Sequence, residues 1–345
     1  MRDAFLLAGV SIEPGKKKTV SIPISRLADH TDMMLKAFVI HGKKPGPNMF
    51  VSGAIHGDEI IGVEIIRRIS DMKLLSKLKG TLILIPVVNS YGFLGMSRYL
   101  PDRRDLNRAF PGMEKGSSAS QLAYIFMQEI VSKCQFGVDL HSGAIHRENL
   151  PQIRADLNDP VVKEMANAFG ASIILNSNLR DGSLREAAQS VGCHTLLYEA
   201  GEALRFDETA IRIGVKGVLG VMRQIGMLPK LKPRKRQIVP IQPVSSHWLR
   251  APISGLMRAS HGLGDAVKKG TVVASIAGPL GEMEEPVLAK YSGVIVGRTN
   301  LPIINRGDAL FHVARVADVN DAETTIEDRV QAAERDPLFD DIGVV

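Results

Sequence analysis

Residues 49–59 read MFVSGAIHGDE, a short apolar run that ends in a histidine and two carboxylates. The run 49–55 has the length and composition of a buried strand. Residues 62–69, which follow closely, place apolar side chains at helical spacing. This alternation of apolar runs and amphipathic stretches continues to residue 225, and it favours helices that cover a mostly parallel or mixed sheet. The predicted fold class is therefore α/β.

The other elements follow from the same two periodicities. Further strands are predicted at 81–88, 136–140, 172–175 and 195–198, and further helices at 121–131, 161–169 and 210–225. Residues 250–316 differ, because many glycines separate short β-branched runs that lack a helical period. We expect an α/β domain at 1–240, a small all-β domain at 241–320, and an acidic tail at 321–345 with a short helix near its start.

Composition and charge exclude several classes of protein. The 345 residues are 45% hydrophobic and 23% charged, which is ordinary globular usage and excludes wholesale disorder. No apolar run approaches the ~20 residues of a membrane span, so no membrane association is expected. The net charge of +6 owes part of its excess to the basic run 230–236.

Two further counts concern partners and location. The chain has one tryptophan and five tyrosines, so stacking partners for nucleic acid are scarce, and the run 230–236 is interpreted as a solvated linker. Cys134 and Cys193 cannot form a disulfide framework. A reducing, cytoplasmic location is therefore expected, with no nucleic-acid partner, and a homo-oligomer stays open.

Two predicted strand ends supply metal-ligand chemistry. His56 and Glu59, three residues apart beyond the strand at 49–55, can face one point across a tight turn, and His141 follows the strand at 136–140. Two imidazoles and one carboxylate are three protein ligands of a catalytic zinc site. The His-x-x-Glu pair alone is a weak signal, since such pairs also occur on solvated loops. Asp139 is either a partner of a ligand histidine or a buried structural residue.

Two further segments carry groups that suit catalysis or recognition. Glu199 follows the apolar run 195–198, where it is either a general base beside an activated water or a surface acid that opens a loop. The loop 103–112 contains three arginines, whose guanidinium groups can bind a substrate carboxylate with two hydrogen bonds. The alternative interpretation is a solvated loop whose arginines form salt bridges with nearby aspartates. His146 is interpreted as a loop histidine without a ligand role.

Four motifs between residues 45 and 225 resemble, in order and approximate spacing, the succinylglutamate desuccinylase/aspartoacylase family, relatives of the zinc carboxypeptidases. They are His56-Gly57-Asp58-Glu59, Asp105-Leu106-Asn107-Arg108, Asp139-Leu140-His141-Ser142 and Tyr198-Glu199-Ala200-Gly201. The resemblance implies one Zn2+ per chain on His56, Glu59 and His141, with Glu199 as general base and acid. It implies that Asn107 and Arg108 hold the substrate carboxylate. It also implies an upstream arginine that polarises the scissile carbonyl, a role that Arg98 or Arg104 can fill.

The implied activity is a zinc-dependent hydrolase that cleaves the acyl amide of a small N-acylated amino acid or related amine. The implied fold is a zinc-carboxypeptidase-like mixed sheet flanked by helices, with the β domain capping the active site. Residues 251–296 also resemble a biotinyl/lipoyl-type barrel-sandwich, but the hairpin 281–285 lacks the lysine of a swinging-arm carrier. Two alternatives stay open: a zinc carboxypeptidase acting on a short peptide, and a non-catalytic binding module with the same fold.

Overall fold

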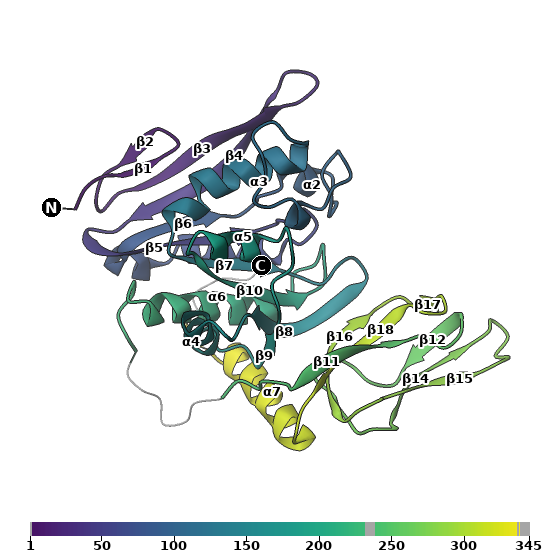
Figure 1. The fold of residues 1–345 in the computed structure, drawn as a ribbon. Helices are drawn as coiled ribbons and strands as arrows, with labels where there is room; N and C mark the ends of the chain where they lie inside the picture. Colours follow the sequence, from purple (N-terminus) through teal and green to yellow (C-terminus); the bar gives the residue numbers. More distant parts are fainter. Residues whose placement is uncertain (1, 232–238, 337, 339–345) are drawn as a thin grey trace.

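The computed structural model describes residues 2–231, 239–336 and 338, and its centre is a twelve-stranded sheet (Figure 1). The middle of the sheet is parallel. Its strands, in spatial order, are β6 (Lys79–Ile85), β5 (Lys44–Gly53), β7 (Phe136–His141) and β10 (His194–Gly201). These are four of the apolar runs predicted as strands, and parallel strands buried on both faces are expected to have such continuous runs.

Antiparallel strands extend the sheet on both sides. One side adds β4 (Asp32–His41) and β3 (Lys17–Arg26), preceded in the chain by the hairpin of β1 (Phe5–Leu7) and β2 (Val10–Ile12). The other side adds β8 (Arg147–Ala155), β16 (Gly293–Thr299), β18 (Ala309–Arg315) and β11 (Ser245–Arg250). The short strands β9 (Ile173–Asn176) and β13 (Ala266–Val267) pair with β8 and β16.

Helices cover both faces of this sheet. One apolar core joins the strands to α1 (Ile61–Ser70), α4 (Pro160–Phe169) and α6 (Glu208–Gln224), and a second joins them to α3 (Ser118–Glu129) and α5 (Leu184–Ser190). The four helices predicted from apolar spacing are confirmed as α1, α3, α4 and α6. The start of α4 shows the local cause: Asp159 accepts hydrogen bonds from the first free backbone N–H groups, and Pro160 occupies the first helical position.

Two further helices complete the fold. The short α2 (Ser90–Leu94) follows β6, and α7 (Val319–Glu334) packs against α6, β13 and β16. The helix α7 confirms the helix predicted near the start of the tail, although it is longer than expected. Most of the basic run 230–236 and the end of the tail lie outside the described residues. Among the helices of residues 2–231 and 239–336, none is both long and apolar enough to cross a membrane.

The β region, residues 245–315, confirms the all-β texture expected from the glycine-rich sequence. A four-stranded antiparallel sheet, in the order β15 (Glu285–Leu288), β14 (Val272–Ala277), β12 (Gly255–Ala259) and β17 (Ile303–Ile304), shares an apolar core with β11, β16 and β18. Because β16 pairs with β8, the main sheet runs into the β region without a break (Figure 1). This continuity was not predicted, since β8 contains Pro151, and proline is rare inside sheets.

Candidate active site

The loop between β5 and α1 carries the first two residues of the site. His56 and Glu59 are joined by a tight turn in which the Glu59 N–H donates to the His56 carbonyl at 3.1 Å. Gly57 packs against the backbone of α2, where an added Cβ would lie 1.9 Å from the carbonyl carbon of Gly92. No side chain fits this contact, so close packing explains the glycine of the motif.

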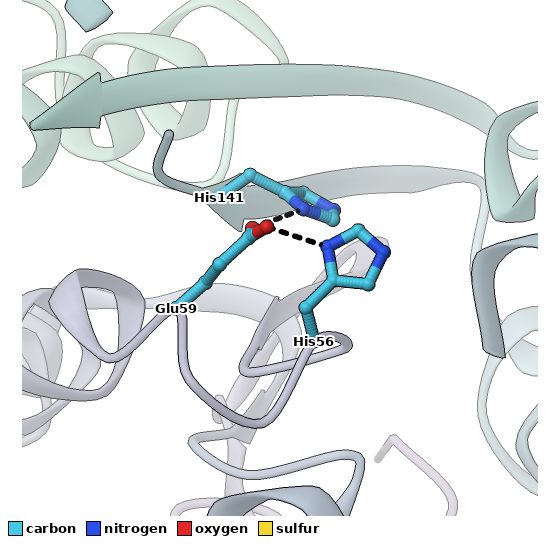
Figure 2. Close-up of side chains that lie close together, drawn as sticks. All are labelled: His56, Glu59 and His141. Atoms are coloured by element: carbon cyan, nitrogen blue, oxygen red, sulfur yellow. Dashed lines mark hydrogen bonds and ion pairs between the residues drawn. The ribbon is translucent and has the colours of Figure 1, made fainter. Parts of the chain in front are cut away.

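Three side chains converge where β5 and β7 end: His56 and Glu59 follow β5, and His141 is the last residue of β7 (Figure 2). Glu59 Oε1 lies 2.7 Å from His56 Nδ1, and Glu59 Oε2 lies 2.7 Å from His141 Nδ1. All three residues are buried, and one ligand atom from each lies within 4.8 Å of the others. Two imidazole nitrogens and a carboxylate oxygen at these separations could hold one metal ion.

Two carboxylates hold the far nitrogens of the histidines. Asp139 Oδ2 accepts from His141 Nε2 at 2.6 Å, and Asp105 Oδ1 accepts from His56 Nε2 at 3.1 Å. Asp139 is fully buried and also accepts from Ser52 Oγ at 2.8 Å. Carboxylates in this position fix the rings of metal-binding histidines and leave the other nitrogen of each ring free to face the ion. The donor set and its outer partners therefore fit zinc, and Asp139 is the histidine partner that the sequence offered as one interpretation.

Burial and charge act in opposite directions on this group. Burial alone would lower the pKa of His141, but the Asp139 and Glu59 carboxylates hold that pKa well above its usual value. Burial would likewise lower the pKa of His56, but the charge of Glu59 and the hydrogen bond to Asp105 raise it. Burial would raise the pKa of Glu59, yet the two histidines hold it far below its usual range. The two histidines and Glu59 therefore stabilise one another's charged forms.

Glu199 lies near the end of β10, and the strand register places it beside His141 on β7. Asn149 Nδ2 donates to Glu199 Oε2 at 2.5 Å, and Arg154 Nε lies 3.3 Å from Glu199 Oε1. The Glu199 side chain is 18% exposed and lines the same cavity as the three ligand-type residues. Of the two interpretations from the sequence, the geometry favours a carboxylate that faces the site over one that opens a surface loop.

A cavity of about 270 Å³ collects most of the predicted site residues. Its lining includes His56, Glu59, His141, Glu199, Arg98, Asn107 and Arg108. Arg98 donates to Glu59 Oε1 at 3.1 Å and to Asp105 Oδ2 at 2.9 Å. Arg104 lies elsewhere: its side chain is 65% exposed, lies beside Asp102 and lines a neighbouring hollow. The structure thus brings Arg98, but not Arg104, into the cavity.

The loop residues Asn107 and Arg108 are held in place by their own chain and by α5. Asp105 Oδ1 accepts from the Asn107 N–H at 2.8 Å and so caps the short turn Leu106–Arg108. Asn107 Oδ1 accepts from the Leu184 N–H at 2.9 Å, which fixes the orientation of this amide. Arg108 donates to the Asn107 carbonyl and remains exposed at the cavity wall.

The cavity also contains residues that sequence reasoning did not single out. They are Arg147, Asn149 and Arg154 on β8, Arg180 and Arg185 around the start of α5, and Trp248 on β11. No motif marks these positions, because an arginine or asparagine inside an unpredicted strand is an ordinary surface residue by sequence. Trp248, the single tryptophan of the chain, brings the β region to the cavity wall, in keeping with the cap that the family resemblance implied.

Comparison with known proteins identifies the family. Residues 45–225, more than half of the chain, match the model of the succinylglutamate desuccinylase/aspartoacylase catalytic domain. The N-alpha-acetyl-L-2,4-diaminobutyric acid deacetylase of Halomonas elongata is 25% identical over 311 residues, which cover 87% of this chain and 91% of the relative.

Solved structures agree with this match. The product-bound ectoine utilization protein EutE (DoeB) of Ruegeria pomeroyi is similar at a TM-score of 0.77 and 23% identity, covering 87% of this chain and 95% of the other. A succinylglutamate desuccinylase of Silicibacter sp. TM1040 is similar at a TM-score of 0.76 and 26% identity, covering 87% and 94%. The matched segment contains all four motifs on which the sequence prediction rested, and the chain belongs to the succinylglutamate desuccinylase/aspartoacylase family.

Proposed function

We propose that this protein is a zinc-dependent deacylase that hydrolyses the bond between an acyl group and the nitrogen of a small amino acid or related amine. The observation that carries the proposal is the placement of Glu199 in one cavity with His56, Glu59 and His141. Membership of a family of deacylating hydrolases supports it, as does the deacetylase from Halomonas elongata. The zinc-carboxypeptidase-like form of the sheet, with the β region as a cap, is part of the same proposal.

The geometry of the cavity supports a separate role for each of these residues in the proposed reaction. His56, Glu59 and His141 would hold the zinc, which would supply a Lewis acid able to lower the pKa of a water and to polarise a carbonyl. Glu199 accepts a proton on one carboxylate oxygen as water attacks the acyl carbon, and it returns that proton to the nitrogen as the C–N bond breaks. The products are a carboxylic acid and an amine, so one water is consumed for each amide cleaved.

Arg98 is the better candidate for the group that stabilises the carbonyl oxygen. Its guanidinium reaches Glu59 Oε1 and Asp105 Oδ2 at the ligand group, whereas Arg104 lines the neighbouring hollow. Donors aimed at the developing charge of a reacting oxygen contribute strongly to catalysis. Asn107 and Arg108, on the short turn that follows Asp105, are proposed to hold the carboxylate of the substrate.

The charge of the cavity favours an anionic substrate. Six arginines line it: Arg98, Arg108, Arg147, Arg154, Arg180 and Arg185. Arg185 is buried, and its pKa is lowered to about 10 by burial and by the neighbouring Arg154. Among the described residues no carboxylate lies within 4.0 Å of Arg185, which donates only at 3.4 Å to the Arg154 carbonyl and to Ser177 Oγ. A second carboxylate on the substrate would neutralise this group.

The test of the proposed function is a substrate panel on the zinc-loaded protein. The acyl group (acetyl or succinyl) and the amino acid (aspartate, glutamate, alanine or 2,4-diaminobutyrate) are varied independently, and release of the free amine is measured. Dipeptides test the carboxypeptidase alternative, and binding without turnover would indicate a binding module. We expect the highest kcat/KM for an N-acyl amino acid with a second carboxylate. A fully loaded protein that hydrolyses none of these amides would refute the proposal.

Arg108→Lys is expected to reduce kcat/KM by roughly ten- to a hundredfold, because an ammonium cannot reproduce the two-pronged contact of a guanidinium with a carboxylate. Metal content should be unchanged, since Arg108 is not a ligand. A substrate analogue whose α-carboxylate is an amide should lose little further activity in the variant, because both changes remove one shared interaction. Equal and independent losses would show that Arg108 has another role.

We also propose a reducing, cytoplasmic setting for this chain. Cys134 and Cys193 are both free thiols, and both are buried. Burial raises the pKa of Cys193 to about 12, so this thiol is inert near neutral pH.

A further inference from the structure

Asn149 occupies the junction between the α/β part and the β region. It lies on β8, opposite Gly201 of β10 on one side and opposite Gly297 of β16 on the other. Directly opposed residues of an antiparallel pair project to the same face of a sheet, and the missing side chain of Gly297 leaves room beside Asn149. A Cβ at Gly201, where the β8–β10 register shifts, would instead lie against Asp207 and Ile61. Asn149 is buried, with 8% of the residue exposed.

The Asn149 amide acts on one residue of the site. Its Nδ2 donates to Glu199 Oε2 at 2.5 Å, while Arg154, also on β8, approaches Glu199 Oε1 at 3.3 Å. The β8–β10 ladder is irregular here: Glu199 is paired with Gln152, and the register shifts before Gly201 pairs with Asn149. Asn149 thus donates the hydrogen bond to one carboxylate oxygen, while Arg154 is a cationic neighbour of the other and its Nε makes no hydrogen bond. The hydrogen bond from Asn149 restricts the rotamer freedom that would otherwise disperse the position of the glutamate.

Gly297 leaves the space that this amide fills. An added Cβ at Gly297 would lie 2.8 Å from Asn149 Oδ1 and 3.3 Å from the Cβ of His312. Gly297 is not among the glycines with positive φ, so its backbone conformation is one that other residues adopt. The requirement for glycine at this position of β16 is therefore one of space.

From this geometry we infer that Asn149 is the positioning residue of Glu199, and that Gly297 of β16, in the β region, leaves the space in which the Asn149 amide lies. The inference rests on the role proposed for Glu199. Asn149 acts on the reaction only through the carboxylate that it orients, so its loss leaves the metal ligands and the substrate clamp untouched. The β region contributes to catalysis in this way as a structural support of the base, in addition to supplying Trp248 to the cavity wall.

The first test replaces Asn149 by alanine and, separately, by the shape-matched leucine. Both variants remove the donor, and hydrogen bonds to charged groups are strong enough that kcat should fall roughly ten- to a hundredfold. KM, zinc content and Tm should stay near the wild-type values. If packing alone mattered, Asn149→Leu would keep the wild-type kcat, and that result would overturn the inference. A loss confined to KM or to zinc content would overturn it as well.

The second test is a double-mutant cycle with Gly297→Ala. This substitution alone should lower kcat, because the new Cβ displaces the Asn149 amide. In the Asn149→Ala background it should have little further effect, since the atom it would strike is gone. Thr299→Ala is the matched control: Thr299 lies two residues along β16, opposite Arg147, and its variant should keep the wild-type kcat. Additive losses from Asn149→Ala and Gly297→Ala would show that the two residues act separately.

Failure of the inference can be told apart from failure of the proposed function. If the wild-type protein hydrolyses amides and Asn149→Leu does so at the same kcat, the inference alone is wrong. If the wild-type protein hydrolyses none, the proposed function is wrong, and crystal structures of wild type and Asn149→Leu decide the positioning role. Glu199 in one unchanged, well-ordered position in both structures would overturn that role, and a displaced or disordered Glu199 in the variant would support it.

Discussion

Glu199→Gln is expected to lower kcat about a thousandfold, within the range assigned to a general acid–base group. Glutamine keeps the size of the side chain, and its amide oxygen can still accept from Asn149 Nδ2. It cannot take a proton from water at neutral pH. KM and zinc content should therefore change little, so that the loss appears in kcat.

The matched control for this prediction is Glu202→Gln. Glu202 lies three residues further along the chain, where its carboxylate accepts from the His146 N–H at 2.9 Å and from the Asn300 amide at 3.0 Å. It does not line the cavity. We expect wild-type kinetics for this variant. A Glu199→Gln enzyme that retains kcat to within about threefold of wild type would mean that another group moves the proton.

The sequence indicated which residues meet in the metal-type group because the ends of parallel strands can be located from apolar runs. His56 and Glu59 are three residues apart beyond the end of one strand, and His141 ends the neighbouring parallel strand. Parallel strands bring their carboxyl ends to the same edge of a sheet, so residues far apart in the chain meet there. The apolar runs that predict the strands therefore also predict that the polar residues at the ends of those strands lie close together.

The remaining residues of the cavity could not be predicted, because they are brought there by long-range contacts that the hydrophobic periodicity of the sequence does not reveal. Asn149 meets Gly297 across a strand pair that joins segments about 150 residues apart, and Pro151 conceals the strand that carries Asn149. The choice between Arg98 and Arg104 depends on how the loop between α2 and Asp105 folds back on itself. Arg98 reaches Asp105 and Glu59, whereas Arg104 stays near Asp102, and no spacing rule separates two arginines six residues apart.

The charged groups of the metal-type site predict how binding depends on pH. The pKa values of His56 and His141 are raised, so below those values protons occupy the ring nitrogens that a cation needs. The apparent affinity for zinc should therefore fall as the pH falls. A raised histidine pKa stabilises the zinc-free fold at low pH, and this contribution is lost as the pH rises through the raised value. The difference in Tm between zinc-loaded and zinc-free protein should consequently widen with increasing pH.

His141→Ala is expected to abolish measurable hydrolysis and to reduce zinc content from one ion per chain to a small fraction. Two consequences act together, because His141 is both a ligand-type residue and the hydrogen-bond partner of Asp139. Asp139 is fully buried, and a buried carboxylate that loses its partner costs about 3–5 kcal/mol of stability. The free energy of unfolding of the zinc-free variant should fall by an amount of that order, measured against zinc-free wild type so that the metal does not contribute.

Chelation separates the two consequences of losing His141. Zinc-free wild type should be inactive and should regain activity when zinc is added. His141→Ala should stay inactive at the zinc concentrations that restore the wild type. His146→Ala is the matched control: His146 lies five residues along, its side chain is 55% exposed, and Glu202 lies 3.9 Å from its ring. This control should keep both zinc and activity, as expected of a loop histidine outside the ligand group. Full activity of chelated wild type would instead mean that His56, Glu59 and His141 form a buried hydrogen-bonded cluster with no metal role, and catalysis would then depend on Glu199 and the arginines alone.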